Sequence, residues 1–515
     1  MAHKIESFPK VQIDFTPKLP RIQKIKDKTK VNLRYSLISP FTFAHIYWDD
    51  KNFELAYEVE EPILNDQEKK YKKEIISAMG EAINFEQIVD NKRNTLLDYL
   101  DKMFRVLAIE LDMDMTYESY QKIFYYLARD FMGFNEVDPL LRDYFVEDIE
   151  CNGVNSPIYI VHRMYRNMKT NIIFKNPSKL ESFVEKLAQR SGKYISYSQP
   201  ILDASLPDGS RVNATYTKDI TSRGPTFTIR KFTKTPWTPP QLLNFKTLSP
   251  EMMAYLWMLI ENHMNILIAG GTASGKTTLL NAIAFFISPE SRVVSIEDTR
   301  ELNLPRENWL PSVVRTATGV KGEGEVDLFA LLRSSFRQNP DYVIVGEVRG
   351  KEAYVLFQGM ASGHSSLGTI HAESVDTVIK RLESPPIELS PTLLNVLDCV
   401  CVMSHASVEG EDTRKLREIV EIINVKDNGI ALTNRPFYWN ASNDNFYFKD
   451  TNKIFEKIST REGIPLNELN MEFSRRSQLL RKLQEQGTFQ FEKVQNIINE
   501  YYKKPKEVLS RYNIR

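Results

Sequence analysis

Apolar side chains recur at helical spacing in three stretches of the chain. In the first, residues 94–131, they fall on one broad face that includes Leu96, Leu97, Leu100, Phe104, Leu107 and Leu111. Residues 180–191 show the same periodicity, as does a C-terminal run with Phe491, Val494, Ile497, Ile498, Tyr501 and Tyr502. Spacing of three and four residues predicts an amphipathic helix at each of these places.

Strand signals occur between these helices. The stretches DIECNG and PIYIVH hold β-branched and aromatic residues, and SLPDGSRVNATY places a turn at Pro207-Asp208-Gly209 between two short runs. Residues 417–438 carry two β-rich runs around Asp427-Asn428-Gly429, which predicts a hairpin. Downstream of residue 240 and up to about Ser404, strands and helices alternate, which predicts a largely parallel sheet covered on both faces.

A proline-rich stretch, KFTKTPWTPP (residues 231–240), separates the N-terminal strands and helices from this alternating region. Proline lacks a backbone donor and fixes φ, so this stretch is expected to be an extended linker. We therefore expect a basic flexible arm at residues 1–30, an N-terminal α/β domain at 31–230, the linker at 231–241, a second α/β domain at 242–440 and a C-terminal helical region at 441–515.

The overall composition excludes several classes of protein. Of 515 residues, 42% are hydrophobic and 26% charged, and the formal net charge is zero, which argues against a basic nucleic-acid coat. No apolar run reaches the length of a membrane span, and the N-terminus lacks the apolar core of a signal peptide. Three cysteines (Cys151, Cys399 and Cys401) form no disulfide or zinc framework, so a reducing cytosol is expected.

The arm is distinguished by its charge. Residues 1–30 hold eight basic residues against three acids, together with Pro9, Pro17 and Pro20. One interpretation is a solvated tail, because blocks of like charge are commonly disordered. The other is an arm that docks on anionic lipid or on a membrane-bound partner.

The strongest chemical signal is a phosphate-binding loop. A strand-like run, NILIA, leads into GGTASGKT and then into a helical run, which matches GxxxxGK[ST] in its required context. In such a loop the lysine reaches the β- and γ-phosphates of ATP and the following threonine hydroxyl ligates Mg²⁺. The predicted nucleotide-binding residues are Gly270, Gly271, Thr272, Ala273, Ser274, Gly275, Lys276, Thr277 and Thr278.

Three further residues are candidates for catalysis. Glu347 follows the buried run YVIV, and Glu297 ends the run VVSIE. Carboxylates at the ends of such strands hold Mg²⁺ together with Thr277 or activate the attacking water. His371 in GHSSLGTIHAES is suited to sense the γ-phosphate or exchange a proton, although a lone histidine is more often part of a core.

Four segments in this order resemble the type II/type IV secretion ATPase superfamily: GGTASGKT, SIEDTREL, NPDYVIVGEVRG and GHSSLGTIHAES. The upstream segments LPDGSRVNATY and FTIRKF, and DFMGFNEVDPLLRDYFVEDIECNGVNSPIYIVH, extend the likeness toward its archaeal branch, in particular the archaellum ATPase. The resemblance implies an α/β fold in which the N-terminal domain is linked to a RecA-like P-loop ATPase domain, followed by a helical extension.

The same resemblance implies a homohexameric ATP-hydrolysing motor that drives assembly or rotation of an archaellum-type filament. It implies that Arg211 and Arg230 reach the phosphates, that a polytopic membrane platform protein and other motor accessory proteins are partners, and that the motor is cytoplasmic and peripheral to the inner face of the membrane. Anionic lipid is a further candidate partner, and nucleic acid is not expected. The alternatives are an archaeal pilus or secretion ATPase, a nucleic-acid-translocating motor, a GTPase switch and a small-molecule kinase.

Overall fold

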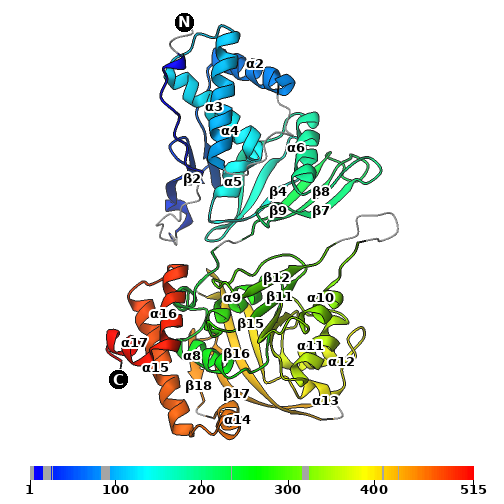
Figure 1. Ribbon diagram of the computed structural model, residues 1–515, viewed down its shortest axis with the longest axis vertical. Coiled ribbons are helices and arrows are strands. Elements are labelled where there is room, and N and C mark those ends of the chain that lie inside the picture. The colour runs from blue at the N-terminus through cyan, green and yellow to red at the C-terminus, as the bar shows by residue number, and fades with distance from the viewer. Residues whose placement is uncertain are drawn as a thin grey trace. The chain divides into compact units, whose positions relative to one another are not determined.

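The computed structural model describes residues 5–15, 25, 27–82, 93–232, 235–315, 324–408, 411–426, 429–449 and 451–514. The chain forms two compact units, Met1–Phe232 and Thr233–Arg515, and their boundary lies inside the proline-rich segment. Each unit contains one nine-stranded sheet (Figure 1). Both units are mixed α/β, which confirms the expected fold class.

The sheet of the N-terminal unit has the order β1-β2-β3-β6-β5-β4-β9-β8-β7. Only the β3–β6 pair is parallel among its neighbouring strands. The predicted strands in DIECNG, PIYIVH and SLPDGSRVNATY are confirmed as β4, β5, β7 and β8. The strands are β1 Asn32–Ile38, β2 Thr42–Asp49, β3 Glu54–Glu60, β4 Val146–Cys151, β5 Pro157–His162, β6 Arg166–Ile173, β7 Ile201–Ser205, β8 Arg211–Thr215 and β9 Thr226–Arg230.

The helices of this unit differ from prediction at one point. The helical pattern at 94–131 forms two helices, because Asp112 adopts a left-handed φ of +46° and Thr116 caps the second helix by accepting from the Ser119 amide. Leu111, expected on the apolar face, is 44% exposed. The helix expected at 180–191 is confirmed as α6. The α-helices are α2 Asp66–Ala82, α3 Arg93–Glu110, α4 Tyr117–Met132, α5 Asp138–Arg142 and α6 Pro177–Arg190.

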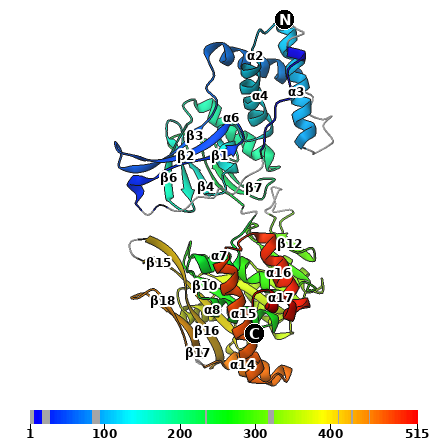
Figure 2. The same ribbon diagram turned by 90° about the vertical axis from the view of Figure 1, so that its left-hand side faces the viewer.

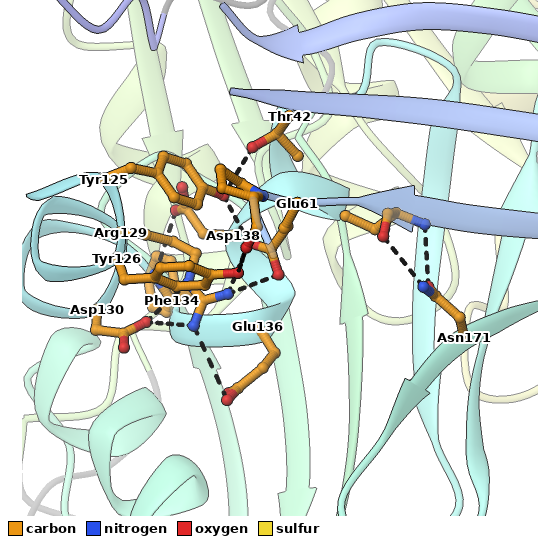
Figure 3. Close-up of polar contacts among 12 residues, drawn as sticks. Thr42, Glu61, Tyr125, Tyr126, Arg129, Asp130, Phe134, Glu136, Asp138 and Asn171 are labelled. Atoms are coloured by element: carbon orange, nitrogen blue, oxygen red, sulfur yellow. Dashed lines mark hydrogen bonds and ion pairs between the residues drawn. The ribbon is translucent and has the colours of Figure 1, made fainter. Parts of the chain in front are cut away.

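A buried polar network connects α4 to the sheet (Figure 3). The Arg129 guanidinium donates to both carboxylate oxygens of Glu61, at 2.6 and 2.8 Å, and lies 2.6 Å from a carboxylate oxygen of Asp130. The Tyr125 hydroxyl donates to Glu61 and accepts from Thr42 of β2. Because buried charges are tolerated only when they are paired, this network fixes how α4 sits on the sheet.

The described part of residues 1–30 does not behave as a free arm. Ile5 and Val11 are buried in the cluster formed by α2, α3 and α4, and Phe15 is buried in the core of the sheet. Arg105 donates to the Ile5 carbonyl at 2.8 Å. The expectation of a wholly flexible segment is therefore wrong at these positions, because apolar side chains spaced among the charges pack on the unit. Several of its basic residues lie outside the described residues: Lys4, Lys18, Arg21, Lys24 and Lys26.

The sheet of the C-terminal unit has the order β12-β11-β13-β14-β10-β15-β16-β17-β18. The pairs from β12 to β15 are parallel, and those from β15 to β18 are antiparallel. The predicted hairpin at 417–438 is confirmed as β16 and β17, with Asp427 and Asn428 outside the described residues. The strands are β10 Ile266–Gly270, β11 Val293–Glu297, β12 Trp309–Val313, β13 Tyr342–Val345, β14 Ser365–Ile370, β15 Cys399–Val408, β16 Glu411–Val425, β17 Ala431–Asn440 and β18 Asn445–Phe448.

Helices cover both faces of this sheet, and each face has its own apolar core. One core is formed with α7, α8, α9 and the C-terminal helices, and the other with α10, α11, α12 and α13. Parallel strands buried on both faces are apolar throughout, as β10 and β13 are. The helices are α7 Pro239–Asn244, α8 Pro250–Glu261, α9 Lys276–Ile283, α10 Leu328–Ser335, α11 Glu352–Ala361, α12 Val375–Glu383 and α13 Pro391–Leu394.

The C-terminal helices share one apolar core with α7, α8 and α9. Helix α15 packs on α7 and α8 (Figure 2). The Trp257 indole N–H of α8 donates to the Tyr502 hydroxyl at 2.9 Å. The helix predicted from Phe491 onward is confirmed. These helices are α14 Lys453–Glu462, α15 Leu466–Glu485, α16 Phe491–Lys503 and α17 Pro505–Arg511.

Candidate functional site

The loop between β10 and α9 has the shape that phosphate binding requires. Ala273 and Gly275 adopt left-handed backbone conformations, with φ of +57° and +93°. A Cβ on Gly270 would lie 2.4 Å from the Ser274 hydroxyl and 2.7 Å from the backbone carbonyl oxygen of Met403, so no side chain fits there. Ser274 in turn donates to the Gly271 carbonyl at 2.8 Å. The loop is therefore tightly folded, and it ends at the N-terminus of α9, where amide groups and the helix dipole favour an anion.

Lys276 is held inside this loop. Its side chain is buried, and its ammonium donates to the Gly271 carbonyl at 2.9 Å and lies 3.4 Å from Nδ1 of His371. Thr277 and Thr278 follow in the first turn of α9. A desolvated cation beside a ring of backbone amides is the arrangement that binds a polyphosphate.

His371 links the loop to the predicted catalytic carboxylate. Its Nε2 lies 3.5 Å from a carboxylate oxygen of Glu347, while its Nδ1 faces Lys276. Burial lowers the pKa of His371, and the charge of Lys276 lowers it further, whereas Glu347 opposes the shift. The ring is thus favoured in its neutral form, which has one donor and one acceptor nitrogen.

Glu297 is a second carboxylate at the same edge, in a different environment. It is 1% exposed, and one of its oxygens accepts from the amides of Glu301 and Leu302, both at 2.9 Å. The other oxygen is buried and has no hydrogen-bond partner among the described residues. Burial raises the pKa of Glu297 to about 7. The adjacent Asp298 is instead paired with Arg349.

The strand order explains why these residues meet. Strands β10, β14, β13 and β11 are adjacent and parallel, so their C-terminal ends lie at one edge of the sheet. Gly346 allows the ends of β13 and β11 to approach, since a Cβ there would lie 3.1 Å from Cγ of Glu297. Lys276, His371, Glu347 and Glu297 all follow or end these strands.

The oxygen donors at this edge suit Mg²⁺. The candidates are the Thr277 hydroxyl, the Glu347 carboxylate and the unpartnered oxygen of Glu297. Mg²⁺ prefers oxygen ligands and takes only one or two carboxylates from a protein, completing its shell with phosphate and water. The described residues hold no cluster of three His, Cys, Asp or Glu that could bind a metal ion by itself.

The two predicted arginines lie in the other unit. Arg211 and Arg230 are opposite one another on β8 and β9, and both are exposed. Arg211 forms a two-point ion pair with Asp203, at 2.9 and 3.2 Å. A role at the phosphates therefore stays a prediction for both.

Two arginines that the motifs did not indicate contact the site. Arg381 of α12 donates to the His371 carbonyl at 2.6 Å, and Arg414 of β16 donates to the Ala273 carbonyl at 3.0 Å. Neither lies in a recognisable motif, so only the fold identifies them.

Among the described residues no helix combines the length and apolar character that crossing a membrane would need.

A family profile described as Type II/IV secretion system protein matches residues 134–409. The chain belongs to this family. An uncharacterized protein of Methanocaldococcus jannaschii is 33% identical over 533 residues, which cover 98% of this chain and 95% of that protein. The conjugal transfer protein TrbB of Rhizobium radiobacter is 31% identical over 49% of this chain and 77% of its own length. Among solved structures, the ATPase DotB of Legionella pneumophila is 18% identical, covers 70% of this chain and 89% of its own, and has a TM-score of 0.40.

Proposed function

We propose that this chain is a Mg²⁺-dependent ATPase that acts as a motor. The observation that carries the proposal is the contact of Lys276 and Glu347 with the same histidine, His371, beside a left-handed phosphate loop. An ammonium, a neutral imidazole and a carboxylate arranged in this way bind a polyphosphate and orient water at its terminal phosphorus. Family membership agrees with ATPase activity in general.

Each residue has a distinct task in this proposal. Lys276 and the loop amides hold the β- and γ-phosphates, and Glu347 accepts a proton from the attacking water. His371 contacts both Lys276 and Glu347. It therefore couples binding of the γ-phosphate at Lys276 to the position of the Glu347 carboxylate. Glu297 and Thr277 supply further oxygens. Bound Mg²⁺ would neutralise charge that develops on the phosphates.

The proposal extends to the N-terminal unit. Arg211 and Arg230 contact the phosphates in the ATP-bound state, and residues 231–241 act as the hinge between the units. Guanidinium groups stabilise the charge that spreads over a transferring phosphoryl group better than ammonium groups do. For Arg211 this requires exchange of its present partner, Asp203, for phosphate.

We further propose that the motor is a cytoplasmic homohexamer on the inner face of the membrane. It drives assembly or rotation of an archaellum-type filament through a polytopic platform protein. The order of its sequence motifs, which resembles that of the archaellum ATPase, supports this role. A second candidate, an ATPase of an archaeal pilus or a secretion system, is favoured by the family description.

Steady-state phosphate release by the purified full chain tests the activity. Lys276→Ala should lower hydrolysis about 10²-fold or more, because it removes one preorganised cation. Lys482→Ala, an exposed lysine of α15, is the matched control and should leave turnover unchanged. Wild-type turnover in Lys276→Ala would refute the proposed site.

Deletion of the gene in its host separates the two cellular roles. Loss of swimming with surface pili retained supports the archaellum motor, and rescue should require an intact Lys276. Loss of pili or of secreted proteins with swimming retained would instead establish the second candidate.

A further inference from the structure

The β15–β16 hairpin forms one wall of the phosphate loop. At Gly275, a Cβ would lie 3.4 Å from Cδ of Arg414 and 3.4 Å from Cε of Met403. The side chains of Arg414 and Met403 therefore lie beside the loop at Gly275. Arg414 also donates from Nε to the Ala273 carbonyl at 3.0 Å. The contact joins residues 141 positions apart in the sequence.

The carbonyl that Arg414 binds belongs to an unusual residue. Ala273 has a φ of +57°, a conformation that residues with a Cβ rarely adopt without support. Hydrogen bonding of its carbonyl by a charged donor is such support, since charge-assisted hydrogen bonds are stronger than neutral ones. The left-handed turn in turn determines where the following amides point.

The strand that carries Arg414 is itself firmly held. Lys415, the next residue of β16, lies on the opposite face of the sheet, as alternation along a strand requires. It is 1% exposed and its ammonium bonds to the Lys246 carbonyl at 3.0 Å and to Asp444 at 2.6 Å. His405 of β15 pairs with Arg414 in the antiparallel register. Arg414 thus projects from a fixed point toward the loop.

From this geometry we infer that Arg414 is a positioning residue of the nucleotide site. It holds the Ala273 turn in its binding-competent form through the Nε–H···O=C bond, so the loop amides meet the phosphates with little reorganisation. The inference rests on the proposed function for its ligand, a nucleoside di- or triphosphate. Because the loop cradles phosphates that ADP and ATP share, the effect is equal for both.

Two substitutions of matched length separate positioning from charge. Arg414→Met removes the donor, whereas Arg414→Gln places a neutral amide N–H at the same distance along the side chain as Nε. The Kd of MgADP and of a non-hydrolysable MgATP analogue is measured by calorimetry with the full chain. We expect Arg414→Met to raise both Kd values about tenfold with kcat within threefold of wild type. Arg414→Gln should stay within about threefold, and Arg435→Met, on the neighbouring strand, should behave as wild type.

Hydrogen exchange of residues 270–276 without nucleotide provides a second readout. These amides should exchange faster in Arg414→Met than in wild type, and in Arg414→Gln, whose neutral N–H is a weaker donor, the rate should lie closer to wild type than to Arg414→Met. If Arg414→Gln is as impaired as Arg414→Met, or if only the ATP analogue binds more weakly, the guanidinium acts on the ligand and the inference is wrong. Wild-type behaviour of Arg414→Met in both assays also overturns it. Failure of the wild-type chain to bind either nucleotide refutes the proposed function, while the exchange result still tests the positioning role.

Discussion

Acidification should destabilise the N-terminal unit through one buried histidine. His162 ends β5 and is fully buried between the rings of Phe145 and Tyr165, with centroids 5.4 and 5.5 Å away. Its Nδ1 accepts from the amides of Met164 and Tyr165, and its Nε2 has no hydrogen-bond partner among the described residues. Burial lowers the pKa of His162 to about 4. Protonation would place an unpaired charge in this core.

The size of the effect follows from linkage. The pKa of the unfolded histidine is 6.5 and that of the folded one about 4, so the neutral ring stabilises the fold above pH 6.5. That stability is lost as the pH falls from 6.5 to 4, at about 1.4 kcal/mol per pH unit and about 3 kcal/mol in all. Between pH 7 and pH 5 the expected loss is about 2 kcal/mol.

Hydrogen exchange of β5, corrected for intrinsic rates, measures this loss in wild type and in His162→Gln. The variant should be less stable at pH 7, since it disturbs the ring sandwich, but it should lose about 2 kcal/mol less than wild type on going to pH 5. Phe174→Leu, which disturbs the same core without removing a titratable group, serves as the control and should keep the wild-type pH dependence. An identical pH dependence in wild type and His162→Gln would refute the reasoning.

Further predictions concern catalysis and stability. Glu347→Gln should bind ATP within a few-fold of wild type yet slow single-turnover hydrolysis about 10²-fold or more, because it removes the proton acceptor; unchanged hydrolysis would exclude Glu347 as the base. Arg211→Ala and Arg230→Ala should each lower turnover by about 10³-fold while ATP binding persists. A change in turnover of only a few-fold would indicate that both arginines form surface ion pairs and do not act at the phosphates. Arg129→Ala should lower the free energy of unfolding, measured in urea, by about 3 kcal/mol, because it leaves the part-buried Glu61 carboxylate without its guanidinium partner. Arg34→Ala, at an exposed pair, should lower it by under about 1 kcal/mol. Equal losses would contradict the assigned role of burial.

The spacing of apolar residues predicted most helices and strands correctly. It failed where a single residue adopts a left-handed conformation, or where helices far along the chain bury a segment. The run before the phosphate loop and the run before Glu347 are strands because continuous apolar sequence suits a strand buried on both faces. The stretch at 94–131 keeps helical periodicity, yet it breaks at Asp112, whose left-handed φ the apolar pattern does not record. Likewise, Ile5 and Val11 are buried within a charged segment because partner helices far along the chain cover them.

The sequence by itself determined the chemistry that resides in short contiguous motifs. Lys276 and Thr277 follow the loop glycines directly, and Glu347 follows its strand, so spacing alone was enough to predict roles for them. Tertiary structure decided which groups face one another. The contact of His371 with both Lys276 and Glu347 depends on strand order, and the raised pKa of Glu297 depends on burial by the surrounding elements. Arg414 reaches the loop only because β15 lies beside β10 and pairs with β16. Such contacts join residues far apart along the chain, and a local pattern of side chains does not contain them.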